Sequence, residues 1–339
     1  VLIHPDDSTA AAHFPDINGA SDGELLAYLA SASQVARINA MREMVTRGSK
    51  PAFTKGLVAM AEDAENPLYA RVAAVMTLKQ LDGPKSHAVL KNLYDDADLR
   101  EYVVRALGDV AGEIDGTSKQ LCLQALQDEN PRVQLRAIIA LARAGDASAA
   151  ADILPLAEDE KLLVDESELQ LGAIGEDGWS ASHRAVPHTA LKAVVKLNAV
   201  DLLLSKLDDE QLRETALRGL QEIHDEKVVA GLANKVEATS DKQLAKLITL
   251  ALLRLYQREA PWNGRTWWQS RPDFRGPYVQ CAKWEQTPAV QAALQTSFRK
   301  VDPADYSELF KMMRKNQVPE DELNLDIEYD EALALLDKK

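Results

Sequence analysis

The sequence predicts an all-α solenoid built from repeated pairs of helices. The chain is rich in alanine and leucine, which favour helices, and only 5% of its residues are aromatic. Apolar residues recur in steps of four, with others at steps of three, which is the spacing of one helix face. These apolar ladders return after about 30 to 35 residues, the length of a two-helix repeat.

Six ladders define the repeat, and their central residues are at positions 40, 74, 103, 137, 190 and 216. The long gap between positions 137 and 190 predicts an insertion. A first helix should precede each ladder helix, and we expect these first helices over 23–30, 52–60, 87–94, 118–126, 147–156, 201–206 and 228–236. The segment Lys242–Arg258 is the most apolar ladder helix, which predicts burial on both of its sides.

The ends of several helices carry their own signals. Asn66 and Asn130 are expected to cap helices whose first residue is a proline, Pro67 or Pro131. His224 replaces a glycine of the ladder pattern, at a helix end where a cation would be favoured. Glycines that suit helix C-caps are Gly48, Gly83, Gly112, Gly116 and Gly145.

Residues 22–258 resemble the HEAT-repeat family through this pattern. The resemblance implies a HEAT-like α-solenoid, a right-handed superhelix of about seven to eight helix pairs, in which each repeat buries its apolar face against its neighbours. An extended segment over 1–21 is expected before the repeats. Helices over 288–299 and 303–315, the second capped by Asp302, should belong to a C-terminal cap spanning 288–339. A globular helical bundle with accidental self-similarity is the alternative.

The composition excludes several classes of function. The 339 residues carry a net charge of −14, with a pI near 5.0, so the chain should repel nucleic-acid phosphates and anionic membranes. No apolar run is long enough to cross a membrane. The two cysteines, Cys122 and Cys281, form no zinc-binding pair. Because the sequence starts without Met or a signal peptide, we expect a processed chain or a piece of a longer one.

The insertion, over about 158–185, is rich in acidic residues. Asp165, Glu166 and Glu168 are weak candidates for a cation site. They lack the spacing of a calcium loop, so a solvated acidic loop is the simpler interpretation.

A second departure from the repeat is an irregular segment over 259–287. Four of the five tryptophans fall within it, together with arginines, glycines and prolines. Such a segment could close the apolar end of the solenoid, or it could stack on a planar ligand or a sugar; both interpretations stay open. The candidate residues for binding a ligand or partner are Trp262, Arg265, Trp267, Trp268, Arg271, Asp273, Arg275, Tyr278 and Trp284.

This segment carries a further resemblance. The run from Leu255 to Gly264 and the pair Trp267-Trp268 resemble the HEAT region of large secreted proteins of Planctomycetes and Verrucomicrobia. So do the short stretches Arg271–Asp273, Gly276–Tyr278, Trp284-Glu285 and Val186–Ala190. In that family the repeats join a sugar-dehydrogenase-like β-propeller to a c-type cytochrome domain. This chain has neither a CxxCH motif nor propeller strands, so the resemblance implies a scaffold part in a periplasmic or secreted protein.

No motif of catalysis or cofactor binding occurs in the sequence: there is no phosphate-binding loop, nucleophile elbow or HExxH. We therefore expect no cofactor and a non-catalytic scaffold for a protein partner or neighbouring domain. A carbohydrate- or small-ligand-binding module that uses the aromatic segment is the alternative. A HEAT-like enzyme such as a DNA glycosylase is a third possibility, which the negative charge disfavours. Exposed tryptophans around a concavity would favour binding, and tryptophans buried against 242–258 would favour capping.

Overall fold

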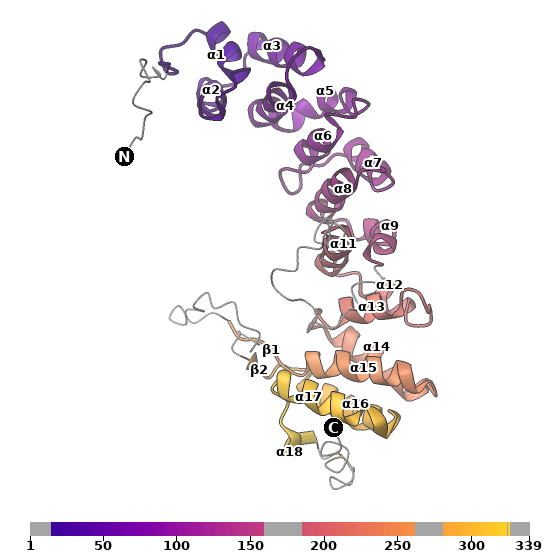
Figure 1. Cartoon of the computed structure of the whole chain (residues 1–339). Helices are drawn as coiled ribbons and strands as arrows, with labels where there is room; N and C mark the ends of the chain where they lie inside the picture. Colours follow the sequence, from indigo (N-terminus) through magenta and orange to yellow (C-terminus); the bar gives the residue numbers. More distant parts are fainter. Residues whose placement is uncertain (1–14, 159–184, 262–280, 324, 326–339) are drawn as a thin grey trace, which may run out of the picture. The chain divides into compact units, whose positions relative to one another are not determined.

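The computed structural model describes residues 15–158, 185–261, 281–323 and 325, and these residues fold as pairs of α-helices (Figure 1). They form two compact units, one ending at Ala149 and the other beginning at Ala150. The expectations for 1–14, for the acidic insertion and for most of the aromatic segment lie outside the described residues. No helix of the described parts is long and apolar enough to cross a membrane.

The first unit contains four helix pairs. Its helices are α1 (Asp22–Leu29), α2 (Gln34–Arg47), α3 (Pro51–Glu62), α4 (Leu68–Asp82), the 3-10 turn η1 (Gly83–Ser86), α5 (His87–Asn92), α6 (Arg100–Leu107), α7 (Gly116–Ala125) and α8 (Pro131–Ala144). Each first helix packs on its own second helix, and the second helices α2, α4, α6 and α8 also pack on one another in succession. The predicted ladder residues Ala40, Ala74, Val103 and Ala137 are fully buried at these contacts.

The second unit repeats this arrangement. It contains α9 (Ala150–Ile153) with η3 (Leu154–Ala157), α11 (Ala185–Lys196), α12 (Val200–Ser205), α13 (Arg213–Leu220), α14 (Glu226–Ala238), α15 (Lys242–Leu255), α16 (Thr287–Phe298), α17 (Tyr306–Lys315) and α18 (Glu320–Leu323). Helix α15 packs against α13, α14, α16 and α17. That position explains its apolar sequence, and it confirms the predicted burial on more than one side.

Helix ends follow the predicted signals with three corrections. Gly112 ends no helix: it lies in the turn after α6, which ends at Leu107 and is capped by Gly108. Asn130 caps α8 by accepting from the backbone N–H of Arg132, but Asn66 does not cap α4, because Pro67 occupies the position before that helix. Gly48, Gly83 and Gly145 end helices with positive φ, as predicted. Gly116 does not: it is the first residue of α7, which Asp115 caps.

An arginine ladder links neighbouring helix pairs. Arg71, Arg100 and Arg213 occupy equivalent positions near the start of α4, α6 and α13, three residues before a central ladder residue. The Nε–H of each donates to a backbone carbonyl of its own pair, at 2.9–3.1 Å. A terminal nitrogen of each donates to an aspartate of the next pair, and these aspartates are Asp96, Asp128 and Asp241. The ladder therefore joins successive repeats by charge-assisted hydrogen bonds.

The C-terminal end of α15 was predicted to extend to Arg258, but the helix ends at Leu255. Arg258 lies in a two-residue strand, β1 (Arg258–Glu259), which pairs antiparallel with β2 (Cys281–Ala282). Farther along, α16 and α17 confirm the two predicted C-terminal helices. Asp302 accepts from the N–H of Ala304 and caps the turn η6 (Pro303–Asp305) that leads into α17.

Three side chains satisfy successive carbonyls at this end of α15. Trp284 Nε1 donates to the carbonyl of Leu255 at 2.8 Å, and the Thr287 hydroxyl donates to that of Tyr256 at 3.0 Å. His224 Nε2 lies 2.8 Å from the carbonyl of Gln257. Carbonyls at the end of a helix have no partner within the helix, so these contacts complete its hydrogen bonding. Burial lowers the pKa of His224, which corrects the expectation of a cation there.

Candidate functional site

An open groove of about 560 Å³ crosses the second helices of the first unit. Nine of its twelve lining residues are apolar or aromatic, and the other three are Gln34, Arg37 and Arg105. The full lining is Leu29, Gln34, Arg37, Ile38, Met41, Leu68, Tyr69, Val72, Ala73, Met76, Tyr102 and Arg105. Its volume is in the range of ligand-binding clefts, about 300–1,000 Å³.

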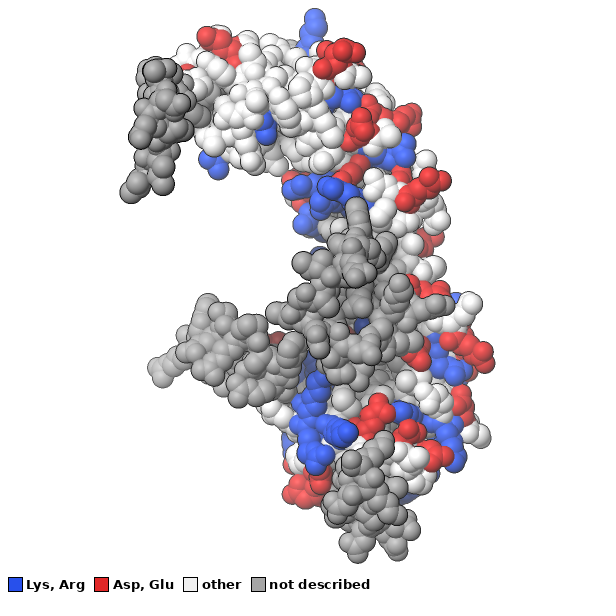
Figure 2. Space-filling view, viewed as in Figure 1, with Lys and Arg blue, Asp and Glu red and all other residues white. Residues whose placement is uncertain are grey.

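Helix geometry explains why these apolar side chains stay outside the core. Helix α2 turns Ala36, Ala40 and Met44 inward, so Ile38 and Met41 fall on the other side and remain half-buried. At the start of α4, Leu68 and Tyr69 are 43% and 40% exposed. Figure 2 shows a largely uncharged surface over α1–α4. The groove is therefore an apolar surface that the first two helix pairs leave partly open.

Arg37 is the ladder arginine of the first helix pair, but its contacts differ from those of the other three. Its Nη1 donates to the carbonyls of Ser31 and Ala32, and its guanidinium lies 4.6 Å from the centre of the Tyr69 ring. No described carboxylate forms an ion pair with it. Arg71 and Arg213 each bind an aspartate that lies four residues before the equivalent position of the next repeat, which is Arg100 or Ala245. For Arg37 that place is Pro67, which has no carboxylate.

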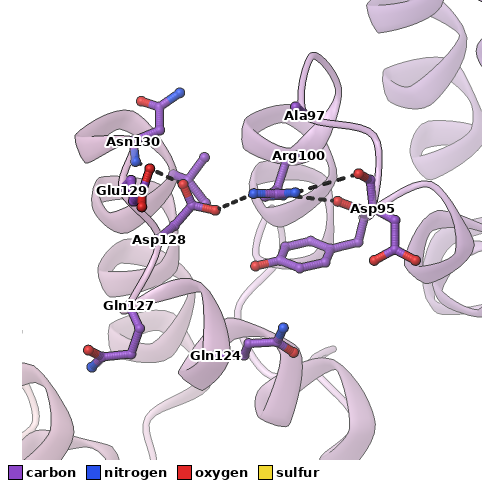
Figure 3. A pocket seen from close by; sticks show the side chains of 10 residues that line it. Asp95, Ala97, Arg100, Gln124, Gln127, Asp128, Glu129 and Asn130 are labelled. Atoms are coloured by element: carbon purple, nitrogen blue, oxygen red, sulfur yellow. Dashed lines mark hydrogen bonds and ion pairs between the residues drawn. The ribbon is translucent and has the colours of Figure 1, made fainter.

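A second pocket, of about 540 Å³, shows the ladder in its complete form (Figure 3). It lies between the turns that precede α6 and α8. Arg100 crosses it, binding Asp128 at 2.8 Å and the carbonyls of Tyr94 and Asp95. Arg100 is already neutralised by Asp128 within the fold, so its charge is not available to bind a ligand in this pocket.

Three further arginines project from α8 beside the groove helix α6. Arg132 and Arg136 share the almost buried carboxylate of Glu101, at 2.7 and 3.2 Å. Arg143 donates to the carbonyls of Gly108 and Asp109. Two guanidinium groups on one carboxylate leave a net positive charge, so this end of the surface favours an anionic partner.

A buried polar cluster around His87 resembles a catalytic triad, but no substrate could reach it. His87 lies within 3.3 Å of the Ser118 hydroxyl and 3.0 Å of Lys79 Nζ, and Lys79 also pairs with Glu113. Ser118 is fully buried, and Asp115, 3.9 Å from His87, is occupied as the cap of α7. A nucleophile must reach its substrate. The cluster is therefore structural, and burial together with Lys79 lowers the pKa of His87.

Of the nine candidate residues in the aromatic segment, the structure describes Trp284. It is 8% exposed, packs edge-on against His224 at 5.2 Å between ring centres, and is bonded to α15. This geometry gives Trp284 a packing role at the end of α15. The eight others, Trp262, Arg265, Trp267, Trp268, Arg271, Asp273, Arg275 and Tyr278, lie outside the described residues, as do the cation candidates Asp165, Glu166 and Glu168. Their binding role stays a prediction. Across the described ranges, no cluster of three His, Cys, Asp or Glu residues could hold a metal ion.

Reasoning from the sequence did not identify the groove. One signal was available, because Leu68 and Tyr69 begin α4 as two large apolar residues, whereas α6, α13 and α15 each begin with two polar residues. The ladder pattern drew attention to buried positions, whereas the groove is formed by the positions between them.

Comparison with known proteins supports the repeat architecture. Residues 94–171 match the family described as HEAT repeats. Together with the stacked helix pairs, this match defines the chain as an all-α protein with a HEAT-like fold.

No curated protein sequence matches the chain. Similar solved structures include YibA of Escherichia coli, at 15% identity over 89% of this chain and 94% of that one, with a TM-score of 0.40. The complex of CpcE and CpcF of phycocyanin lyase from Nostoc is 18% identical over 85% and 99%, with a TM-score of 0.36. An engineered protein is 16% identical over 95% and 88%, with a TM-score of 0.33.

Proposed function

We propose that this chain is a non-catalytic HEAT-repeat interaction module that binds a protein partner or a neighbouring domain through the groove on α2, α4 and α6. The observation that carries the proposal is the groove itself, an apolar surface left open on the second helices of a repeat array. Repeat arrays present such surfaces for binding because each repeat uses only part of its surface for stacking.

Covering the groove would remove further apolar surface from water, which favours association. Leu68 and Tyr69 still expose 43% and 40% of their surface, so covering each should contribute less than half of the about 1.5–3 kcal/mol that full burial of an exposed apolar side chain gives. Two or three such contacts, with an ordered rim, are typical of the small set of residues that dominate an interface. The half-buried Ile38, Met41 and Met76 adjoin them and add adaptable apolar contact.

Site-specific photo-crosslinking tests the proposal. A photoreactive phenylalanine replaces Tyr69 in the groove. In a matched variant it replaces Lys55, an exposed residue of α3, the first helix of the same pair. Irradiation in the producing cells should give a discrete crosslinked species from position 69 and none from position 55. Equal labelling from both positions, or none from position 69, would contradict an interaction function for this groove.

We further propose, on the resemblance of the aromatic segment, that the chain acts as the scaffold part of a larger secreted or periplasmic protein that processes carbohydrates or carries out redox chemistry. The size and location of the native protein test this, by immunoblotting of periplasmic and secreted fractions. A single cytoplasmic species with the mass of this chain alone would overturn it.

Sugar binding by the aromatic segment is a second candidate, favoured by the four tryptophans between Trp262 and Trp284. Tryptophan fluorescence should then respond to a titration with neutral sugars. An unchanged spectrum across a glycan panel would remove this candidate, and Trp284→Phe serves as the control for the tryptophan that packs on α15.

A further inference from the structure

We propose that the groove binds an acidic amphipathic helix presented by the partner, an inference that rests on the proposed interaction function. The groove complements both the apolar face and the acidic flanks of such a helix. Its floor is apolar, and its charged lining residues are both cations, Arg37 and Arg105. No acidic side chain among the described residues lines the groove, although the chain as a whole carries a net charge of −14.

Arg37 gives the stronger argument of the two cations, because the equivalent arginines each have an aspartate partner and Arg37 has none among the described residues. Arg71, Arg100 and Arg213 each bind an aspartate of the following repeat. Arg37 reaches no described carboxylate and rests on the ring of Tyr69 at the mouth of the groove. A guanidinium held by carbonyls and an aromatic face keeps its charge and can bind a carboxylate in a bidentate way.

Arg105 extends the positive charge along the same surface. It is exposed, and it forms no ion pair with any carboxylate in the described part of the chain. Beyond it, Arg132 and Arg136 share Glu101, so this side of α6 and α8 also has more cations than anions. The partner should therefore place its carboxylates at both ends of the apolar contact.

The groove favours a helix over an extended peptide. Side chains line it, and Gln34 is the only amide among them. An extended peptide would bury its backbone N–H and C=O groups against this surface without partners, which costs free energy. A helix satisfies these groups internally and presents apolar side chains at spacings of three and four residues. The apolar floor also favours a helix over a nucleic acid, because phosphates could bind only the arginines at the edge of the groove.

Fluorescence anisotropy with designed peptides tests the inference on the full chain. The probe is a labelled helix with leucines on one face and glutamates on its flanks. One control peptide replaces the glutamates by lysines, and another keeps the composition but scatters the leucines around the helix. A labelled oligothymidylate represents a nucleic acid. We expect the acidic amphipathic peptide to bind at least about tenfold more tightly than each of the others.

Three variants link binding to the named residues. Arg37→Glu and Arg105→Glu should each weaken the acidic peptide about tenfold and favour the lysine peptide. Lys55→Glu makes the same charge change on α3 and should leave binding unaltered. Pro67→Asp supplies the missing ladder aspartate. It should draw Arg37 into an ion pair and cap α4, so that the unfolding midpoint rises while acidic-peptide binding falls.

Equal binding of the acidic and lysine peptides would overturn the inference, as would preferred binding of the oligonucleotide or indifference to Arg37→Glu in a variant with normal helicity. A rise in midpoint for Pro67→Asp without any loss of binding would overturn the role of Arg37. The proposed function fails separately. A partner crosslinked at position 69 that carries no acidic helix leaves the interaction module standing and removes only this inference.

Discussion

Arginines at one repeat position perform two different tasks in this chain. Arg100 is neutralised by Asp128 and two carbonyls, whereas Arg37 is held by carbonyls and the Tyr69 ring. The carboxylate of Asp128 is mostly buried, so losing Arg100 should cost more stability than losing one partner of an exposed ion pair. Breaking a buried pair leaves an uncompensated charge, and this costs more than the pair itself contributes.

Because Arg100 is partly exposed and Asp128 is mostly buried, we expect Arg100→Ala to lower the free energy of unfolding by about 1–3 kcal/mol. Arg37→Ala, with no carboxylate left behind, should cost under about 1 kcal/mol. Urea unfolding followed by circular dichroism measures both. Similar losses for the two variants would show that the ladder aspartates add little.

His87 predicts a pH dependence of stability. Burial first, and then Lys79 and Lys91, lower its pKa below the ordinary value of 6.5, against the opposite effect of Asp115 and Glu113. The unfolded chain then takes up a proton at a pH where the folded chain does not. Stability from a neutral His87 is fully present above pH 6.5 and is lost as the pH falls through the depressed folded pKa.

The urea midpoint should accordingly fall between pH 7 and pH 5, and His87→Gln should flatten that fall. His224, whose pKa is also lowered by burial, contributes in the same direction and accounts for a remaining slope. His188→Gln, at an exposed position, is the matched control. A slope equally steep in His87→Gln would locate the titrating group elsewhere.

At the level of elements, close contact between helices depends on single small residues. A Cβ added to Gly108, which ends α6, would lie 2.3 Å from the Cβ and 2.6 Å from the Cα of Ala140 in α8. Since the second atom belongs to the backbone, no side-chain rotation relieves the clash. Gly116, the first residue of α7, has open space around it.

Gly108→Ala should thus destabilise the chain by about 1–3 kcal/mol, the usual cost of overpacking. Gly116→Ala should be close to neutral. The difference between their urea midpoints is the measurement. A midpoint for Gly108→Ala equal to that of Gly116→Ala would mean that α6 and α8 can separate at no cost.

Trp284 makes the corresponding prediction for the end of α15. Trp284→Phe keeps an aromatic ring in place but removes the hydrogen bond to the carbonyl of Leu255, so stability should fall by about 1–2 kcal/mol. Thr287→Ser, which keeps the hydroxyl that reaches Tyr256, should change little. Thermal unfolding of both variants checks this, and equal behaviour would argue against a capping role.

The sequence predicted these elements well where a periodic burial pattern governs them. The ladder residues Ala40, Ala74 and Ala137 are local signals of a helix face, and the helices lie where the period placed them. Features that depend on contacts between repeats were not predictable in the same way. The groove needs the spacing of three helices, and the strand pair β1–β2 joins residues on either side of a long segment.

For the whole molecule, the repeats make coupling between neighbours the main source of stability. Within the first unit, successive helix pairs contact one another, through α2 and α4, α4 and α6, and α6 and α8. Stability in such arrays is a sum of repeat terms and nearest-neighbour terms. Damage at one repeat should therefore spread to its neighbours and fade beyond them.

Hydrogen exchange of Arg100→Ala tests this locality. Amides of α5, α6, α7 and α8 should exchange faster than in the unaltered chain, while those of α14, α15 and α16 should keep their protection. The same comparison with Lys55→Glu gives the background. Uniform acceleration along the chain would indicate a single cooperative fold instead.

Pro67 has a consequence for how charge is assigned along a repeat protein. Arg37 has the same side chain as Arg71, Arg100 and Arg213, yet within the described part of the chain it lacks their ion pair with an aspartate. The identity of a residue at a repeat position therefore does not show whether its charge is available to a partner. That information lies in the residues of the neighbouring repeat that could supply the counter-ion.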